Sequence, residues 1–472
     1  MTELSREPNK HIVFIFVAVG IFMSTLDGSI VNIALPAIMK DFSTSLATVK
    51  WVMIIYLLIV SSCLLSFGRL SDIRGRRLVY GTGLLVFSAG SLCCAMSVSV
   101  GMLIGSRALQ GLGAAMIMAC TPALIVDTFP VPERGKYLGM IGAVVASGLT
   151  LGPAIGGFLL HTFTWRSIFY INLPIGVAAA MLILTYLKNG HADVKNDEPF
   201  DTLGAICLAI SISAFIMVVS NGYAWGMAST PFITLFFVGL AASGCLLFSE
   251  PRTHFPVLKM SLFRIRLFTL PVLAAIALFG SLFTMVFLMP FFLVVHLKLP
   301  DMHAGAMMVI PFVFLFLIAP VSGTMSDKIG SRFLCTAGMM LTTVALYLLS
   351  RLPADAGFIS VGWRMGLAGM GTAIFSSPNT SAAMGAVPGN RRGIAGGIVA
   401  AARNLGMVIG VSMAGAIFNF IFDTLTGGET LNTYRPELEF AFMQAFSTAM
   451  LSGAVLAGMG MVLAFLRGAD RV

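Results

Sequence analysis

Long apolar segments alternate with short polar ones along almost the whole chain. A helix needs about 20 apolar residues to cross the hydrocarbon core of a bilayer, and segments of roughly that length recur from residue 11 to residue 466. We therefore predict about fourteen membrane-spanning helices. They lie near residues 11–36, 47–68, 78–97, 101–128, 135–160, 165–187, 202–221, 231–249, 267–297, 302–325, 332–350, 356–385, 393–422 and 440–466.

The composition and the distribution of charge support a membrane protein. Of the 472 residues, 58% are hydrophobic and only 10% are charged, which excludes a soluble globular domain. Twenty of the 29 Lys and Arg residues fall on the side of the membrane that carries the N-terminus, and six fall on the opposite side. Because basic loops favour the cytoplasm, both termini are predicted to be cytoplasmic. The net charge of +9 is thus a topology signal, and no nucleic acid partner is expected.

Two parts of the chain repeat each other in sequence. The segment GRLSDIRGRR (68–77) matches GTMSDKIGSR (323–332), and two further groups of residues match in the same order. The pairs in those groups are Arg107 with Arg364, Gly113 with Gly371, Gly135 with Gly393, Gly148 with Gly406, Gly152 with Gly410, and Gly157 with Gly415. We predict an all-α protein of two parallel six-helix halves, 1–188 and 267–472. A linker and two inserted helices occupy 189–266.

The segment GLTLGPAIGG (148–157) places small residues along one side of a predicted helix. Gly148, Gly152 and Gly156 recur every four residues, so another backbone can approach them closely. Pro153 lacks an amide hydrogen, which predicts a bend in this helix. Such a stripe alone usually serves packing, but its partial copy in the second half favours a role in moving the two halves.

Five segments resemble motifs of the major facilitator superfamily, and the resemblance covers nearly the whole chain. They are GRLSDIRGRR (68–77), RALQGLGAA (107–115), GLTLGPAIGG (148–157), LDGSIVNIALP (26–36) and WRSIFYINLPIG (165–176). The third is similar to the helix motif of antiporters, with Gly148, Gly152, Pro153, Gly156 and Gly157. The last two look like signatures of the fourteen-helix drug:proton antiporter branch. The resemblance implies the fold of that superfamily, alternating access, and a proton as the coupling ion with no other cofactor.

Asp27 and Arg107 are the candidate proton-coupling residues. Asp27 lies about 13 Å, and Arg107 about 9 Å, from the outer ends of their predicted spans by helical rise. A carboxylate at such a depth is costly and is by default functional. Loss of water favours its protonated form, so a proton on Asp27 would break the pair with Arg107 and a substrate would displace that proton. The alternative is a permanent structural ion pair.

The inner loop 68–77 contains a candidate conformational latch. Its residues are Gly68, Asp72, Arg76 and Arg77, together with Asp127 at the inner end of the fourth predicted span. Ion pairs among them would hold the halves together on the cytoplasmic side and stabilise the outward-open state. The alternative is that these basic residues only set the topology.

The substrate cavity is expected to lie between the halves and to have an adaptable lining of Met and aromatic residues. The candidate lining residues are Asn32, Tyr56, Gln110, Met116, Phe287, Arg403 and Asn404. The charged residues that lie well away from the ends of the predicted spans are one acid, Asp27, and three bases, Arg107, Arg364 and Arg403. This balance disfavours a dicationic cargo.

The leading hypothesis is a proton-coupled exporter of amphipathic drugs, monomeric in a bacterial plasma membrane. A second hypothesis is an exporter of a specific anionic or zwitterionic metabolite, siderophore or lipid, which the excess of buried bases favours. A third is a passive facilitator or channel, which the glycine stripe and the candidate latch disfavour. The six His residues show no metal-ligand spacing, and no catalytic motif is present, so neither a metal site nor an enzyme is expected.

Overall fold

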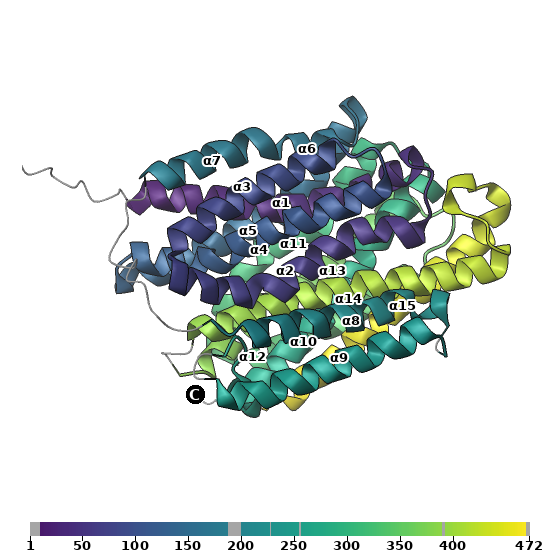
Figure 1. Ribbon diagram of the computed structural model, residues 1–472. Helices are drawn as coiled ribbons and strands as arrows, with labels where there is room; N and C mark the ends of the chain where they lie inside the picture. The colour runs from purple at the N-terminus through teal and green to yellow at the C-terminus, as the bar shows by residue number, and fades with distance from the viewer. Residues whose placement is uncertain (1–9, 187–199, 227, 254–255, 389–391, 469–472) are drawn as a thin grey trace, which may run out of the picture.

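The structure is a computed structural model that describes residues 10–186, 200–226, 228–253, 256–388 and 392–468. These residues form a bundle of long helices joined by short loops, and no strand occurs among them (Figure 1). Thirteen of the helical segments in this described part are long and apolar enough to cross a membrane. A further helix, Phe358–Gly385, has the length of a span but is richer in glycine and hydroxyl side chains. The all-α membrane fold predicted from the sequence is confirmed.

The helices fall into three consecutive groups. The first contains α1 (Lys10–Asp41), α2 (Leu46–Arg74), α3 (Arg76–Ala95), α4 (Val100–Thr128), α5 (Val131–Thr162), α6 (Ser167–Tyr170) and α7 (Asn172–Tyr186). The second contains α8 (Thr202–Trp225) and α9 (Thr230–Ser249), followed by the short 3-10 helices Glu250–Arg252 and Met260–Arg264. The third contains α10 (Arg266–Pro290) with a π-helical end (Phe291–His296), α11 (Asp301–Ile329), α12 (Ser331–Ser350), α13 (Phe358–Gly385), α14 (Arg392–Thr426) and α15 (Glu439–Leu466). Two 3-10 turns, Leu431–Thr433 and Pro436–Leu438, lie between α14 and α15.

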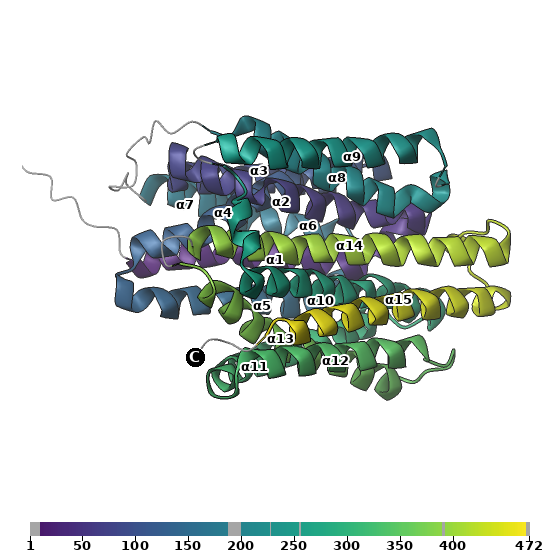
Figure 2. The ribbon, with the colours of Figure 1, turned by 90° about the horizontal axis from the view of Figure 1, so that it is seen from below.

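The first and third groups pack their helices in the same way. Helix α4 contacts α2 and α3 while α5 contacts α1, and in the third group α13 contacts α11 and α12 while α14 contacts α10. The two groups meet along α5 with α11 and along α2 with α14. Helix α1 begins, and α15 ends, at the same end of the bundle (Figures 1 and 2).

The repeated loops 68–77 and 323–332 owe their shape to one glycine each. Gly75 between α2 and α3 has φ 92° and ψ 129°, and Gly330 between α11 and α12 has φ 83° and ψ 147°. Residues with a Cβ atom rarely adopt this region. Each glycine therefore lets one long helix end and the next begin without an intervening loop, at equivalent places in the two halves.

The glycine stripe of α5 lies against α1. A Cβ atom on Gly148 or Gly152 would overlap the Thr25 or Ser29 side chain, and the Ser29 Oγ donates to the Gly148 carbonyl at 3.1 Å. The second half repeats this contact, since Gly410 of α14 lies against the backbone of Gly280 in α10. Helix α5 continues as one helix through Pro153. The stripe thus holds helix pairs together within each half.

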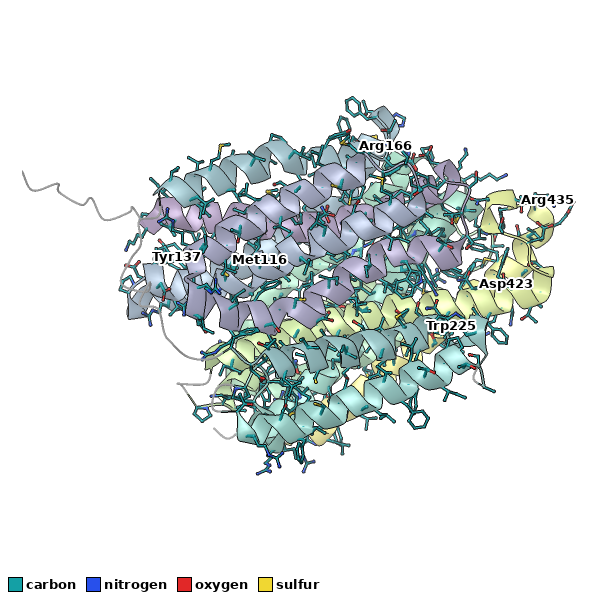
Figure 3. The ribbon with its side chains drawn as sticks, viewed as in Figure 1. Met116, Tyr137, Arg166, Trp225, Asp423 and Arg435 are labelled. Carbon is teal, nitrogen blue, oxygen red and sulfur yellow. The ribbon has the colours of Figure 1, made fainter. Side chains whose placement is uncertain are left out.

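The end of the bundle opposite the loop 68–77 is closed by contacts between the halves. Gly157 near the end of α5 lies against Gly305 near the start of α11, so closely that either would clash if it carried a Cβ atom. The Asn432 side chain, between α14 and α15, donates to the Thr44 carbonyl between α1 and α2. Figure 3 labels Arg435 at this end and Tyr137 at the opposite end.

The inserted helices lie beside one side of the two-half bundle. Helix α8 contacts both α2 and α14, whereas α9 lies outermost and packs mainly on α8 (Figure 2). Lys50 of α2 fastens this hairpin, because its buried Nζ donates to the Ser220 carbonyl of α8 at 2.7 Å. Lys50 is one of the six basic residues that the sequence places on the outer side, and it lies one turn inside α2, where α8 covers it.

The close packing of α14 on α10 gives a stability prediction. Replacing Gly410 by Ala places a Cβ atom against the backbone of Gly280, which cannot move aside as a side chain can. We expect Gly410→Ala to lower the free energy of unfolding by about 1–3 kcal/mol, measured as a lower Tm of the purified protein in detergent. Gly105→Ala is the control, because nothing lies near Gly105 where a Cβ would stand. Equal Tm values for the two variants would contradict this account.

Candidate functional site

A buried ion pair joins α1 to α4 in the first half. The Asp27 Oδ2 accepts from the Arg107 Nη1, and the two side chains are 0% and 1% exposed. The Arg107 Nε also donates to the Val52 carbonyl of α2 at 3.1 Å. A charge removed from water needs such a partner, because transfer to an apolar interior is otherwise very costly. The structure thus pairs the two residues that the sequence selected.

Amide side chains from α4 and α7 complete the surroundings of Asp27. Its Oδ1 accepts from the Gln110 Nε2 at 2.8 Å and from the Asn172 Nδ2 at 3.0 Å. Gln110 also accepts from the Arg107 Nη1 and donates to the Ser91 Oγ at 2.7 Å. The carboxylate of Asp27 therefore keeps hydrogen-bond donors on Oδ1 even if Oδ2 loses its arginine.

Sequence reasoning missed Asn172 and Ser91. Asn172 begins α7 and lies within the motif WRSIFYINLPIG (165–176), which was used only to recognise the family resemblance. An asparagine in a predicted membrane span was the available signal, because buried amides need hydrogen-bond partners. Ser91 of α3 carried no such signal, since serine is common in membrane helices.

A cavity of about 1070 Å³ lies between the two halves. Helices α1, α2, α4 and α5 line it from the first half, and α10, α11, α13 and α14 line it from the third group. Gly139 and Gly142, near the start of α5, and Met384, near the end of α13, line the part nearest the loop 68–77. Since Gly157 and Gly305 close the opposite end, the cavity faces the end of the bundle that carries this loop.

Tyr56 separates the cavity from the ion pair. Its ring lines the cavity, and the Arg107 Cζ lies 4.1 Å from the ring centroid. The Tyr56 hydroxyl donates to the Ser24 carbonyl at 2.9 Å, which fixes the ring. Gly28, which follows Asp27 in α1, also lines the cavity. A molecule in the cavity therefore lies one ring away from the buried charges.

Three of the seven predicted lining residues, Tyr56, Arg403 and Asn404, line this cavity. The other four lie elsewhere. Gln110 belongs to the hydrogen-bond network of Asp27, Met118 lines the cavity where Met116 does not, and Asn32 and Phe287 are buried in the helix packing (Figure 3 labels Met116). Residues two positions apart point to nearly opposite sides of a helix, so the sequence identified the right helix for Met116 but the wrong face.

Arg403 is the one charged residue among those that line the cavity within the described part of the chain. Its Nε is buried and has no hydrogen-bond partner there, and its Cζ lies 5.6 Å from the Phe279 ring centroid. Arg364 differs, because it lies outside the cavity lining and its Nη1 donates to the Ser360 carbonyl at 2.6 Å.

The candidate latch residues meet, but within the first half only. Arg76 forms ion pairs with Asp72, at 3.0 Å, and with Asp127, and its Nη1 donates to the Ala123 carbonyl at 3.3 Å. Arg77 donates to the Leu184 carbonyl of α7. None of these bonds joins the two halves, as expected when the cavity faces this end. Gly68 lies in α2 with open space beside it.

The second copy of the loop makes one equivalent bond. The Arg332 Nε donates to the Phe465 carbonyl of α15 at 2.8 Å, as Arg77 donates to α7. The side chain of Asp327, which matches Asp72, lies outside the described residues.

Comparison with known proteins identifies relatives that span the chain. The family model described as Major Facilitator Superfamily matches residues 17–411 and 272–471. The riboflavin transporter RibZ of Clostridioides difficile is 33% identical over 465 residues, which cover 98% of this chain and 99% of that protein. The multidrug resistance protein Stp of Mycobacterium tuberculosis is 32% identical over 403 residues, covering 84% and 74%.

A solved structure shows the same fold. A bacterial homologue of the human lysosomal transporter Spinster, crystallised in an inward-facing and unoccupied conformation, superposes with a TM-score of 0.70. The alignment covers 98% of each chain at 14% sequence identity. The likeness extends over the two-half bundle and concerns the fold alone.

The buried ion pair gives a prediction for stability. Arg107→Met or Asp27→Leu alone leaves one buried charge without its partner, which destabilises by about 3–5 kcal/mol. The double variant removes both charges, so we expect it to lose less than the sum of the single losses, by about 0.5–3 kcal/mol. The measurement is unfolding of the purified variants in mixtures of mild detergent and dodecyl sulfate. Losses that add within about 0.5 kcal/mol would show that the two charges do not depend on each other.

Proposed function

Because this chain belongs to the Major Facilitator Superfamily, we propose that it is a proton-coupled antiporter that exports amphipathic drugs by alternating access. The observation that carries the proposal is the buried Asp27–Arg107 pair one tyrosine ring away from a large, mostly apolar cavity. Relatives named as resistance proteins support export of drugs, among them Stp and the methylenomycin A resistance protein of Streptomyces coelicolor, which is 29% identical.

Asp27 is the proton carrier in this proposal. When its Oδ2 takes up a proton, the bond to the Arg107 Nη1 loses its ionic character, while Gln110 and Asn172 still donate to Oδ1. Arg107 then turns its unpaired charge toward the Tyr56 ring and the cavity. A substrate that displaces Tyr56 favours the re-formed ion pair and thus releases the proton, which couples the two movements.

The two halves exchange access by rocking about the cavity. We assign the end that carries the loop 68–77 to the cytoplasm, because basic residues concentrate there. Both termini are then cytoplasmic and the structure is inward-facing. In the outward-facing state we expect the cluster of Arg76, Asp72 and Asp127 to contact the other half and close this end, and the contact of Gly157 with Gly305 to open. The relatives RibZ and Stp are bacterial proteins, which supports a location in a bacterial plasma membrane. We expect the protein to act there as a monomer surrounded by lipid.

A second candidate function is transport of a defined metabolite. The riboflavin transporter RibZ matches almost every residue of this chain, at 33% identity. This second function differs from drug export only in the cargo, since the fold and the cavity are the same. A passive channel is disfavoured, because Gly157 packed against Gly305 closes one end while the cavity faces the other.

Inside-out vesicles that hold a proton gradient test the proposal. Each of three compounds, ethidium, 1-pyrenebutyrate and riboflavin, is added, and dissipation of the gradient is recorded. We expect at least one compound to dissipate it, and Asp27→Asn to abolish the effect. Asp41→Asn is the matched control, since Asp41 ends the same helix but pairs with the half-exposed Arg166 at 3.1 Å.

Either of two results decides against parts of this function. Dissipation that persists in Asp27→Asn would move the proton site away from Asp27. Riboflavin transport without any effect of ethidium or 1-pyrenebutyrate would replace the drug-export function with transport of a metabolite.

A further inference from the structure

The charge of the cavity is unbalanced. Its lining contains Arg403 and, within the described residues, no carboxylate. Asp27 is already paired with Arg107, which lies behind the Tyr56 ring. Arg403 is partly exposed, and a guanidinium that lines a mostly apolar cavity without a counter-ion is less favourable than a paired one. An anionic group that enters the cavity would remove this cost.

The surroundings of Arg403 suit an anion attached to an aromatic body. The guanidinium faces the Phe279 ring at 5.6 Å, and Phe283 and Phe316 line the cavity with it. Hydroxyl groups of α13 line the cavity as well, from Ser376, Ser377, Thr380 and Ser381. Positions one and four apart place these hydroxyls on one face of α13. The cavity thus combines one cation, several hydroxyl groups and aromatic surface.

We propose that Arg403 is the specificity-determining residue of the cavity and that the cargo is an aromatic amphiphile with an anionic group, such as a carboxylate, sulfonate or phosphate, bound by the Arg403 guanidinium. Planar guanidinium groups bind such anions through two parallel hydrogen bonds. The Arg403 Nε has no hydrogen-bond partner in the described structure, so no protein acceptor holds the guanidinium through this atom. The ring system of the cargo lies against Phe279 and Phe283.

This proposal names the cargo class for the proposed transport function and rests on that function only in taking the cavity as the transport site. Binding to purified protein without a proton gradient tests it separately from antiport. The probes are three pyrene compounds that share one ring system and differ in charge: 1-pyrenebutyrate, 1-pyrenebutanol and 4-(1-pyrenyl)butyltrimethylammonium. Their fluorescence reports binding to the detergent-solubilised protein.

We expect the wild type to bind the butyrate at least about tenfold more tightly than the alcohol, and the trimethylammonium compound most weakly. Arg403→Met should remove the preference for the anion while leaving binding of the alcohol nearly unchanged. Arg403→Lys keeps the charge without the planar fork and should retain part of the preference. Arg364→Met is the matched control, because Arg364 is also a membrane arginine with a buried Nε but does not line the cavity.

Each result has a definite meaning. A wild type that binds all three probes equally, binds none, or prefers the cation overturns the proposal, even if proton antiport is found in vesicles. An anion preference that survives in Arg403→Met also overturns it. Conversely, an Arg403-dependent preference in a protein that dissipates no proton gradient supports the cargo class and contradicts the coupling. If Arg403→Met does not fold, Arg403→Lys and the wild type still give the ratio of anion to cation binding.

Discussion

A carboxylate and a guanidinium that are both removed from water stay charged only while each serves as the partner of the other. Asp27 and Arg107 meet this condition in the first half of the molecule, and the helices around them are arranged to maintain it. Helix α2 supplies a carbonyl to Arg107 and the Tyr56 ring that covers it, while α4 and α7 supply amides to Asp27. A change in the charge of Asp27 therefore alters contacts among four helices, α1, α2, α4 and α7.

Close helix packing connects the surroundings of Asp27 to the contact between the two halves. Glycine lets α5 lie against α1 and α14 lie against α10, so the helices of each half pack as one body. The halves meet along α5 with α11 and along α2 with α14. Helix α2 belongs both to the surroundings of the ion pair, through Tyr56, and to the contact between the halves, through α14. Through Lys50 it holds the inserted hairpin as well.

The sequence predicted the features that depend on composition and repetition. Span length, the two halves and the pairing of Asp27 with Arg107 follow from hydropathy, repeated glycines and the cost of buried charge. The sequence did not predict which side of a helix faces the cavity, so Met116 was chosen where Met118 lines it. It also missed Asn172, because that residue meets Asp27 only through the packing of α7, and Lys50, because the covering helix α8 is distant in sequence.

The central claim is that the proton carried by Asp27 and the cargo in the cavity exclude each other. It is tested most directly by adding to weakly buffered purified protein an amphiphile that the wild type binds, while a pH-sensitive dye records any proton released. The account predicts that the wild type releases protons on binding, and that Asp27→Asn binds the same compound without release. Binding to the wild type with no release, or release that persists in Asp27→Asn, would contradict it.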